Sequence, residues 1–304
     1  MNIEFDLANV TLTEFGVGRD DGSGQTFVVV PVDGNVQDAL REMAQETWDA
    51  MQKDEGGPGK YEPSEKHGSI EYLYLPLDSE MAIAVRELHE AANLKINADA
   101  LVEKPYDVFC YFARFTDNQN RQLTALRRAS QFKGILKSKN RLVRISDDTL
   151  MVIEDTVFKL DNDFDLLVDS TNVHILRPSG FEFAGKLQQA ILEAVPKNIA
   201  AIKKQLKFVA FEGIETYASK HTRAARYLAS ILANGETKNI DKALLKKLCK
   251  QTGVTVVESN GKVSIADGHE MGFLEVLDRR RYEVNLVKEE PEQYRAASRR
   301  KIND

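Results

Sequence analysis

Residues 107–115 read DVFCYFARF, and this stretch decides the fold class. Successive residues of a β-strand point to opposite faces of its sheet. Both faces are apolar here, with Val108, Cys110 and Phe112 on one and Phe109, Tyr111, Ala113 and Phe115 on the other. A strand with two apolar faces is typical of a sheet that is covered on both sides. The stretch therefore predicts a central strand.

The sequence after this strand favours a β core followed by helices. Between residues 141 and 176, short β-type runs alternate with Asp, Asn and Ser clusters, as in an antiparallel meander: LVRI, TLMVI, VFKL, FDLLV and VHIL. Helical patterns take over further on, with helices expected over 181–195, 197–207, 221–233 and 240–252. Asn260-Gly261 lies between two apolar runs, which is a strong signal for a β-hairpin.

The sequence before the strand combines strands with helices. Strands are expected over 5–17, 26–32 and 70–77. Apolar residues three or four apart predict a helix from Val36 to Met51. This portion therefore contributes both kinds of element to the fold.

Together these patterns predict an α+β protein with an antiparallel β core. We expect two portions: an acidic α+β portion over 1–106, and a portion over 107–304 that holds the β core and basic helices with a winged-helix-like hairpin. The hydrophobic share of 42% and the charged share of 29% are ordinary for a globular protein, which excludes a disordered chain or a collagen-like rod.

Cysteine usage and hydropathy indicate the compartment. Cys110 and Cys249 stand far apart and neither belongs to a paired motif, which favours reduced thiols in the cytoplasm. The N-terminus lacks the pattern of a secretory signal. No segment approaches the roughly 20 apolar residues of a membrane-spanning helix, so we expect no direct membrane insertion.

Charge is divided unevenly along the chain. Residues 1–108 hold 22 acidic and 8 basic side chains, whereas residues 109–304 hold 25 acidic and 33 basic ones. The stretch between Asp117 and Asp147 contains eight basic residues and no acidic one, and residues 147–182 contain nine acidic and two basic ones. The basic block could follow a phosphate backbone. Alternatively, the basic and acidic blocks pair with each other within the fold or across a dimer.

Two sets of basic residues are the candidate DNA contacts. The first is Arg121, Arg127, Arg128, Lys133, Lys137, Lys139, Arg141 and Arg144. The second is Lys242, Lys246 and Lys250, which recur on a helix whose packed face is expected to be Ile240, Leu244 and Leu248. No cluster of Arg, Asn or Gln begins that helix, so the expected contact is independent of base sequence. A solvated lysine face on a packing helix is the alternative.

One acidic run has a catalytic appearance. Asp161, Asp163 and Asp165 alternate along the chain and could hold Mg²⁺ for phosphodiester cleavage. The run does not fit a calcium-binding loop, because Leu166 stands at the sixth position and Asn172 at the twelfth. No phosphate-binding glycine loop, nucleophile motif or metal-type histidine spacing is present in the sequence. We therefore expect no catalytic residue, no metal and no cofactor, and we keep a metal-dependent nuclease as an alternative.

Three stretches resemble the KwaB family of Kiwa anti-phage defence proteins. They are FARFTDNQNRQLTALRRASQFKGIL, FKLDNDFDLLVDSTNVHILRPSGFEF and LDRRRYEVNLVKEEPEQYRAASRRK, the last with Tyr282, Tyr294 and Ser298 placed as the family places them. The resemblance spans residues 107–301. The acidic N-terminal third is similar to the family only in length and general character.

The resemblance implies a non-enzymatic subunit that binds DNA without sequence specificity. It also implies self-association as a homodimer or larger homo-oligomer, and recruitment to the inner face of the inner membrane by a membrane-spanning KwaA-like subunit. The family offers no catalytic residue to transfer. A further alternative is an adaptor or assembly subunit without direct DNA binding, whose acidic N-terminal third docks on a basic membrane-protein face.

Overall fold

The structure is a computed structural model that describes residues 3, 5–22, 24–54, 57–101, 107–129, 143–146, 149–152, 158–235, 237–287 and 290–297. The chain divides into two compact units. The first, here called the sheet unit, comprises Met1–Tyr61 and Gly68–Lys186. The second, the helical unit, comprises Glu62–His67 and Leu187–Asp304. The expected α+β class is confirmed.

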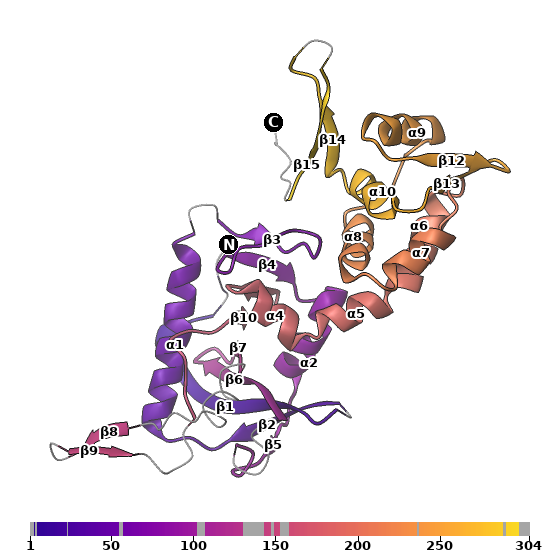
Figure 1. Cartoon of the computed structure of the whole chain (residues 1–304). Coiled ribbons are helices and arrows are strands. Elements are labelled where there is room, and N and C mark those ends of the chain that lie inside the picture. The colour runs from indigo at the N-terminus through magenta and orange to yellow at the C-terminus, as the bar shows by residue number, and fades with distance from the viewer. Residues whose placement is uncertain are drawn as a thin grey trace. The chain divides into compact units, whose positions relative to one another are not determined.

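A nine-stranded sheet forms the body of the sheet unit, in the order β3-β4-β11-β10-β7-β6-β1-β2-β5 (Figure 1). The pairs are antiparallel except for β3 with β4 and β2 with β5, which are parallel and lie at the two edges. The bounds are β1 Val10–Asp20, β2 Gln25–Val30, β3 Gly59–Lys60, β4 Leu73–Pro76, β5 Lys95–Ile96, β6 Val108–Asp117, β7 Gln122–Arg128, β10 Leu166–Val168 and β11 Asn172–Ile175. A separate pair, β8 Val143–Ser146 and β9 Thr149–Val152, also belongs to this unit.

The strand predicted from residues 107–115 is confirmed as a central strand. β6 pairs with β1 on one side and with β7 on the other, and its residues are buried on both faces. The predicted division at 106/107 lies inside the sheet unit, because β6 pairs with β1 in one sheet. The change in charge near residue 108 therefore does not coincide with the boundary between the compact units.

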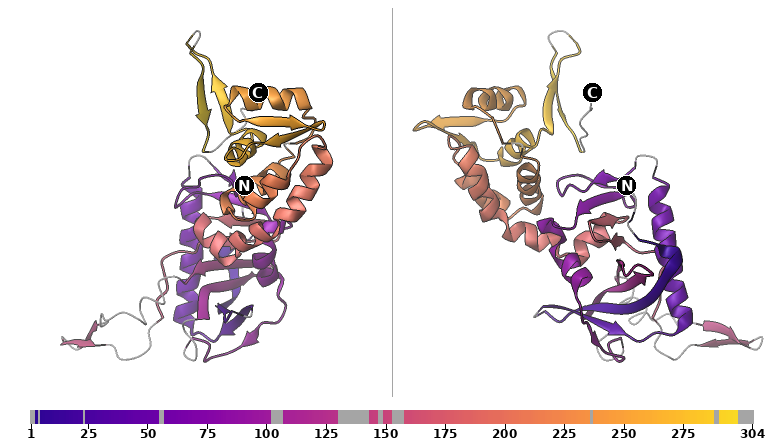
Figure 2. Two further views of the ribbon diagram at one scale, coloured as in Figure 1. Left: turned by 45° about the vertical axis from the view of Figure 1, so that its right-hand side comes forward. Right: turned by 180° about the vertical axis from the view of Figure 1, so that it is seen from behind.

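Helix α1, Gly34–Gln52, covers one face of the sheet (Figures 1 and 2). Its N-cap is Asp33, whose side chain accepts a hydrogen bond from the backbone N–H of Val36. Leu40 and Met43 pack with Phe15 and Tyr111 in one apolar cluster. The helix predicted from its apolar spacing is therefore present, and its stripe supplies this side of the core.

The opposite face of the sheet is covered by a short helical segment and by α4, Pro178–Ala184. The segment consists of η2, Glu80–Ala82, followed by α2, Ile83–Glu90, and Ser79 caps it by accepting from the N–H of Met81. His89 of α2 hydrogen-bonds to Thr124 Oγ1 over 2.9 Å. Because neighbouring residues of a strand point to opposite faces, Thr124 lies on the face away from α1.

Two glycines of β1 allow bulky side chains to pack on this second face. A Cβ atom at Gly16 would overlap the ring of Phe112, and one at Gly18 would lie 2.5 Å from Sγ of Cys110. These residues pair across the sheet, Gly16 with Phe112 and Gly18 with Cys110. Glycine at both positions therefore makes room for the aromatic and sulfur side chains of the central strand.

The helical unit is built from α5 Leu187–Glu193, α6 Val195–Gln205, α7 Glu212–Ala218, α8 Thr222–Ala233, α9 Lys242–Gln251 and α10 Glu270–Leu277. Helix α10 is buried from Gly272 to Leu277 and packs against α7, α8, α9 and strand β14, Arg281–Val284. One helix was predicted over 181–195, but two are present. Lys186, with φ of 48°, separates α4 from α5.

Two hairpins complete the helical unit. In the first, β12, Val256–Ser259, pairs with β13, Lys262–Ile265. Its turn residues Asn260 and Gly261 have φ of 52° and 75°, as a two-residue hairpin turn requires. In the second, β14, Arg281–Val284, pairs with β15, Glu292–Arg295, and extends beyond the helices of this unit (Figure 2). The predicted hairpin is present, and its winged-helix-like role stays a prediction.

Candidate nucleic-acid interface

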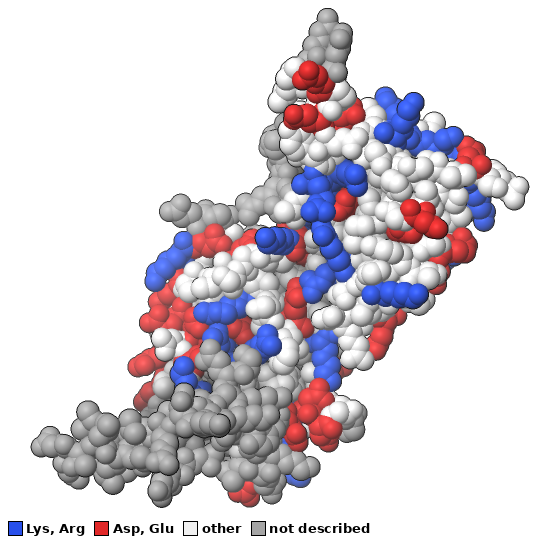
Figure 3. Space-filling view, in the orientation of Figure 1, with Lys and Arg blue, Asp and Glu red and all other residues white. Residues whose placement is uncertain are grey.

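Helix α9 carries the second predicted set of lysines. The helix begins after Asp241, whose side chain accepts from the N–H of Leu244 over 2.7 Å. Lys242, Lys246 and Lys250 lie four residues apart and so share one side of the helix. Figure 3 shows basic side chains gathered over α9.

The packed face of α9 differs from the prediction. Leu245 and Cys249 are buried, whereas Leu244 is 44% and Leu248 is 37% exposed. The segment KALLKKLCK has apolar residues on two adjoining stripes, and the helix uses one of them to pack against α10, β12 and β14. The predicted face of Ile240, Leu244 and Leu248 was therefore wrong, and α9 presents both leucines and lysines at its surface.

One glutamate of the β12–β13 hairpin accepts hydrogen bonds from two of the lysines. The Nζ atoms of Lys242 and Lys246 both donate to the carboxylate of Glu258 in β12, the second over 2.6 Å. Hydrogen bonds from Lys242 and Lys246 lower the pKa of Glu258 to about 2. The carboxylate stays ionised at neutral pH and cancels part of the positive charge at this end of the lysine row.

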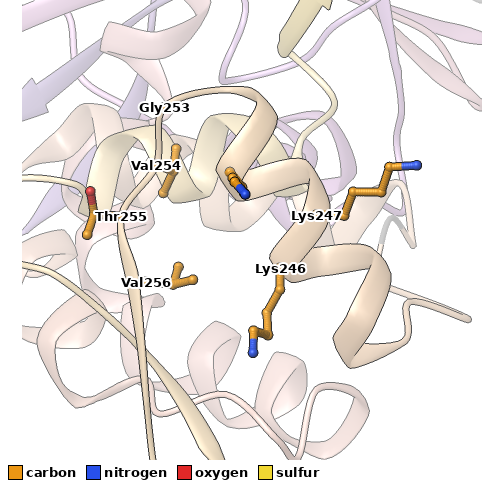
Figure 4. A pocket seen from close by; sticks show the side chains of 7 residues that line it. Lys246, Lys247, Gly253, Val254, Thr255 and Val256 are labelled. Carbon is orange, nitrogen blue, oxygen red and sulfur yellow. The ribbon is translucent and has the colours of Figure 1, made fainter.

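The other end of the row opens into a hollow of about 590 Å³ between α9 and β12. Its lining comprises Lys246, Lys247, Lys250 and the backbone turn from Gly253 to Val256 (Figure 4). Within the described part of the chain, Lys247 and Lys250 have no ion pair with an acidic side chain. In Figure 4, Lys246 extends from α9 beside Val256 and Lys247 points in another direction. Three lysines thus contribute to the lining of a surface hollow that also includes Val254, which is buried.

The first predicted set has a different setting, because Arg127 of β7 lies among the carboxylates of the acidic run. Its guanidinium is 2.7 Å from Asp165, 3.2 Å from Asp161 and 3.4 Å from Asp163. Burial raises the pKa of Asp165, and the charge of Arg127 opposes that rise. At this point the basic and acidic blocks pair within the fold, which was one of the two interpretations of the charge pattern.

A second arginine completes this ion cluster. Arg177 donates to Asp163 over 2.6 Å and to the carbonyl oxygen of Phe164 over 3.1 Å. Asp161 also accepts from the hydroxyl of Tyr111 over 3.1 Å. The three carboxylates that would bind Mg²⁺ in a nuclease therefore already face two guanidinium groups. Among the described residues, no group of three or more His, Cys, Asp or Glu side chains is arranged to hold a metal ion.

The structure describes some of the remaining basic residues of the first set and not others. Arg128 lies over the ring of Phe183, 4.0 Å from its centroid, and Arg121 is paired with Asp117 at 2.7 Å. Arg144 belongs to β8, of which the backbone alone is described. The other four predicted contacts lie outside the described residues: Lys133, Lys137, Lys139 and Arg141.

Two residues of the β14–β15 hairpin, outside both predicted contact sets, lie beside the end of α9. Arg281 of β14 donates from Nε to the carbonyl oxygen of Thr252, directly after α9, over 2.8 Å. Gln293 of β15 donates to the carbonyl oxygen of Gln251 over 3.1 Å. Arg281 belongs to a run of three arginines at residues 279–281, but it is the fold of the hairpin that places it beside α9.

Comparison with known families identifies the chain. The family described as "Kiwa protein KwaB-like" matches residues 106–286, which is more than half of the 304 residues. The chain belongs to the KwaB-like family. In this KwaB-like chain, the match begins just before β6 and includes the acidic run, α9 and the β12–β13 hairpin. No curated protein and no solved structure matches the chain.

Family membership indicates involvement in Kiwa anti-phage defence. Tyr282 and Tyr294, which carried part of the resemblance, are cross-strand partners in the β14–β15 hairpin, with ring centroids 6.0 Å apart and stacked rings. Ser298 lies outside the described residues. In the portion of this KwaB-like chain that the structure describes, none of the helices is both long enough and apolar enough to span a membrane.

Proposed function

We propose that this KwaB-like chain is a non-enzymatic, sequence-independent DNA-binding subunit of a Kiwa anti-phage system. The observation that carries the proposal is the lysine row of α9, which borders the hollow between α9 and β12. Lys246, Lys247 and Lys250 present three ammonium groups at this surface, and Glu258 compensates only one of the three. Ammonium groups bind phosphates as point charges, and contacts to phosphate carry no sequence information.

The composition of α9 supports contact with the backbone rather than with base edges. Base readout uses planar side chains such as Arg, Asn and Gln, which bond to two atoms of one base. The exposed residues of α9 are Ala243, two leucines and three lysines, and its one Gln, Gln251 at the end of the helix, is half-buried. The proposed complex is therefore held by charge, and its affinity should fall steeply as salt rises.

The arginine-rich first set is the second part of the proposed interface. Arg121 and Arg127 face carboxylates, so a phosphate would have to share or displace those partners. Arg128 is stacked on Phe183. Of the proposed contacts, the α9 lysines are therefore the first to test.

Fluorescence anisotropy with a labelled DNA duplex of arbitrary sequence, titrated at several salt concentrations, tests the proposal. The test variant combines Lys246→Gln, Lys247→Gln and Lys250→Gln. Loss of three phosphate contacts should make the slope of log K against log salt less negative by about 3 and weaken binding at least tenfold at moderate salt, roughly independently of DNA sequence. The matched control is Lys53→Gln, Lys60→Gln and Lys95→Gln, which removes three exposed lysines from the sheet unit.

Two outcomes would overturn the proposal. One is a wild-type chain that does not bind DNA even at low salt, which would favour the adaptor. The other is a lysine variant that binds DNA as tightly as the control variant does. Circular dichroism of both variants checks that the helices are retained.

We further propose that the chain self-associates as a homodimer or larger homo-oligomer and acts at the inner face of the inner membrane with a membrane-spanning KwaA-like subunit. Both parts rest on membership of the KwaB-like family. Co-purification of the two subunits from detergent-solubilised membranes, and light scattering of the chain alone, test them. A monomer that remains entirely in the soluble fraction in the presence of its partner would contradict both.

A further inference from the structure

One carboxylate of the helical unit faces three arginines. The Glu275 side chain of α10 is 3% exposed, and its oxygens lie 3.5 Å from Arg281, 3.5 Å from Arg295 and 3.8 Å from Arg223. The arginines come from β14, β15 and α8 respectively. We call this set the Glu275 cluster. It carries one negative and three positive charges, so its local excess is two positive charges.

Two of these arginines are placed where like charges normally repel. Arg281 and Arg295 are direct cross-strand partners in the hairpin. Like charges at such positions destabilise a β-ladder, since their side chains lie side by side. Glu275 lies within ion-pair distance of both and offsets part of this repulsion. One carboxylate is insufficient for the pair and Arg223 together, so a further anion would relieve the remaining repulsion.

A neighbouring arginine shows how this unit neutralises a cation that has a structural role. Arg280 is fully buried and bonds to Asp278 over 2.6 Å and to Glu65 over 3.1 Å. Its positive charge is thus matched by carboxylates within the unit. The Glu275 cluster differs in that its cations outnumber its carboxylate and remain accessible, Arg223 and Arg295 being more than half exposed.

The guanidinium groups retain donors for a ligand. Arg223 and Arg295 each approach Glu275 through a single terminal nitrogen. A guanidinium has five N–H donors arranged as a fork that fits phosphate oxygens. Within the described residues, neither arginine has another acidic partner. The buried carboxylate therefore positions the cluster, and the exposed edges of the two arginines remain available.

The Glu275 cluster borders the lysine hollow. Arg281 holds the carbonyl oxygen of Thr252, and the hollow is lined by the residues that follow, Gly253 to Val256. In α10, Gly272 has both Nη1 of Arg281 and Cγ2 of Val254 as close neighbours. The segment 252–254 thus separates two cationic surfaces of one unit.

We propose that the Glu275 cluster binds a phosphate group through Arg223, Arg281 and Arg295, and that this phosphate belongs to the backbone of the same DNA that contacts the α9 lysines. The second part rests on the proposed function. The first part, a phosphate site, does not. A free phosphate would be recognised by the same chemistry, and the two sources are separated below.

The test variant is Arg223→Gln with Arg295→Gln, which keeps Glu275 and Arg281 in place. Its control is Lys204→Gln with Lys207→Gln, which removes two exposed positive charges from the same unit. In the DNA titration, the arginine variant should show a slope less negative by about 2 and an affinity about tenfold weaker at moderate salt. The control should stay near the wild type. A thermal shift with inorganic phosphate against chloride at equal ionic strength gives a second measurement.

The outcomes separate the two proposals. A DNA defect specific to the arginine variant supports the backbone phosphate. Unchanged DNA binding with loss of the phosphate-induced thermal shift supports a site for a free phosphate and overturns its assignment to DNA. If the arginine variant matches the control in both measurements, the phosphate site is overturned while the lysine test still stands. A wild type that binds no DNA but is stabilised by phosphate through these arginines contradicts the proposed function and retains the site.

Discussion

Arg280 donates from Nε to Oδ2 of Asp278 over 2.6 Å, and neither side chain is exposed to solvent. The same guanidinium donates to the carbonyl oxygen of Ala297 and to Oγ of Ser64. Arg280 therefore joins three stretches of the helical unit: the end of α10, the segment Glu62–His67 and the residues after β15. A buried charge with several partners contributes little net free energy, but removing one partner leaves the others uncompensated.

Replacement of this arginine should destabilise the helical unit strongly. Arg280→Met keeps much of the side-chain volume but removes the buried cation that Asp278 contacts, and breaking a buried ion pair in this way costs about 3–5 kcal/mol. Hydrogen exchange measured by mass spectrometry should show faster exchange in α10 and in the segment Glu62–His67. The neighbouring Arg279→Met, at an exposed position, is the control and should change stability by less than about 1 kcal/mol. If the amides of α10 and of Glu62–His67 exchange equally slowly in both variants, the prediction is contradicted.

The sheet unit should lose stability in acid through Asp169. This carboxylate accepts from Nε2 of His174 over 3.0 Å and from the N–H groups of Thr171 and Asn172. Burial raises its pKa, but these hydrogen bonds outweigh burial and hold the pKa far below its usual range. A carboxyl group with a lowered native pKa stabilises the fold above its unfolded pKa of about 3.9, and this contribution is lost as the pH falls toward the native pKa.

The sole tryptophan reports this effect directly, because the ring centroid of Trp48 lies 6.0 Å from that of His174. Urea unfolding followed by Trp48 fluorescence should show a midpoint that falls below about pH 4. Asp169→Asn should lower the free energy of unfolding by about 1–3 kcal/mol at neutral pH. It should also make this free energy depend less on pH below about pH 4. Asp78→Asn, at an exposed position, should leave the profile unchanged. If the urea midpoint of Asp169→Asn falls with decreasing pH as steeply as that of the wild type, other groups cause the acid effect.

Neutralising Glu258 should strengthen DNA binding. This glutamate holds Lys242 and Lys246, so Glu258→Gln leaves both ammonium groups without their charged partner. We expect several-fold tighter binding and a slope of log K against log salt more negative by about 1 to 2. Glu193→Gln on α5 removes an exposed negative charge from the same unit and is the matched control. A Glu258 variant that gains no more affinity than this control would contradict the role assigned to α9.

The chain should not cleave DNA when Mg²⁺ or Mn²⁺ is added. Arg127 and Arg177 lie against the carboxylates of Asp161, Asp163 and Asp165, and a divalent ion would have to displace both guanidinium groups. Supercoiled plasmid incubated with the chain and either metal should remain supercoiled on a gel. Nicking that disappears in Asp163→Asn would establish the nuclease instead.

The sequence predicted those elements whose signals are local. The central strand β6 could be recognised because apolar residues occupy both of its faces, and the β12–β13 hairpin because Asn260-Gly261 favours the required turn. Strand β7 could not be recognised in this way, because Leu123 and Leu126 are three residues apart, a spacing that also fits a helix. Its pairing with β6 and β10 comes from the sheet, through contacts between residues distant in the sequence.

The candidate site was only partly predictable for the same reason. The lysines of α9 follow a helical repeat and were found from it, but the buried stripe was not, because two adjoining apolar stripes suited the same helix. The Glu275 cluster draws one residue from each of α8, α10, β14 and β15, so no spacing in the sequence marks it. Pairing between the basic and acidic blocks was one of two interpretations of the charge pattern. The positions of the side chains were needed to show that Arg127 is the residue that pairs with the acidic run.

The segment Glu62–His67 has a practical and an evolutionary consequence. It belongs to the helical unit although the residues on both sides of it belong to the sheet unit. A recombinant fragment that starts at Leu187 would lack Glu62, Ser64 and Glu65, so Arg280 would lose these partners, whereas Asp278 would be retained. No single cut in the gene yields the complete helical unit. Exchange of this unit between relatives therefore requires two separate stretches of coding sequence to be inherited together.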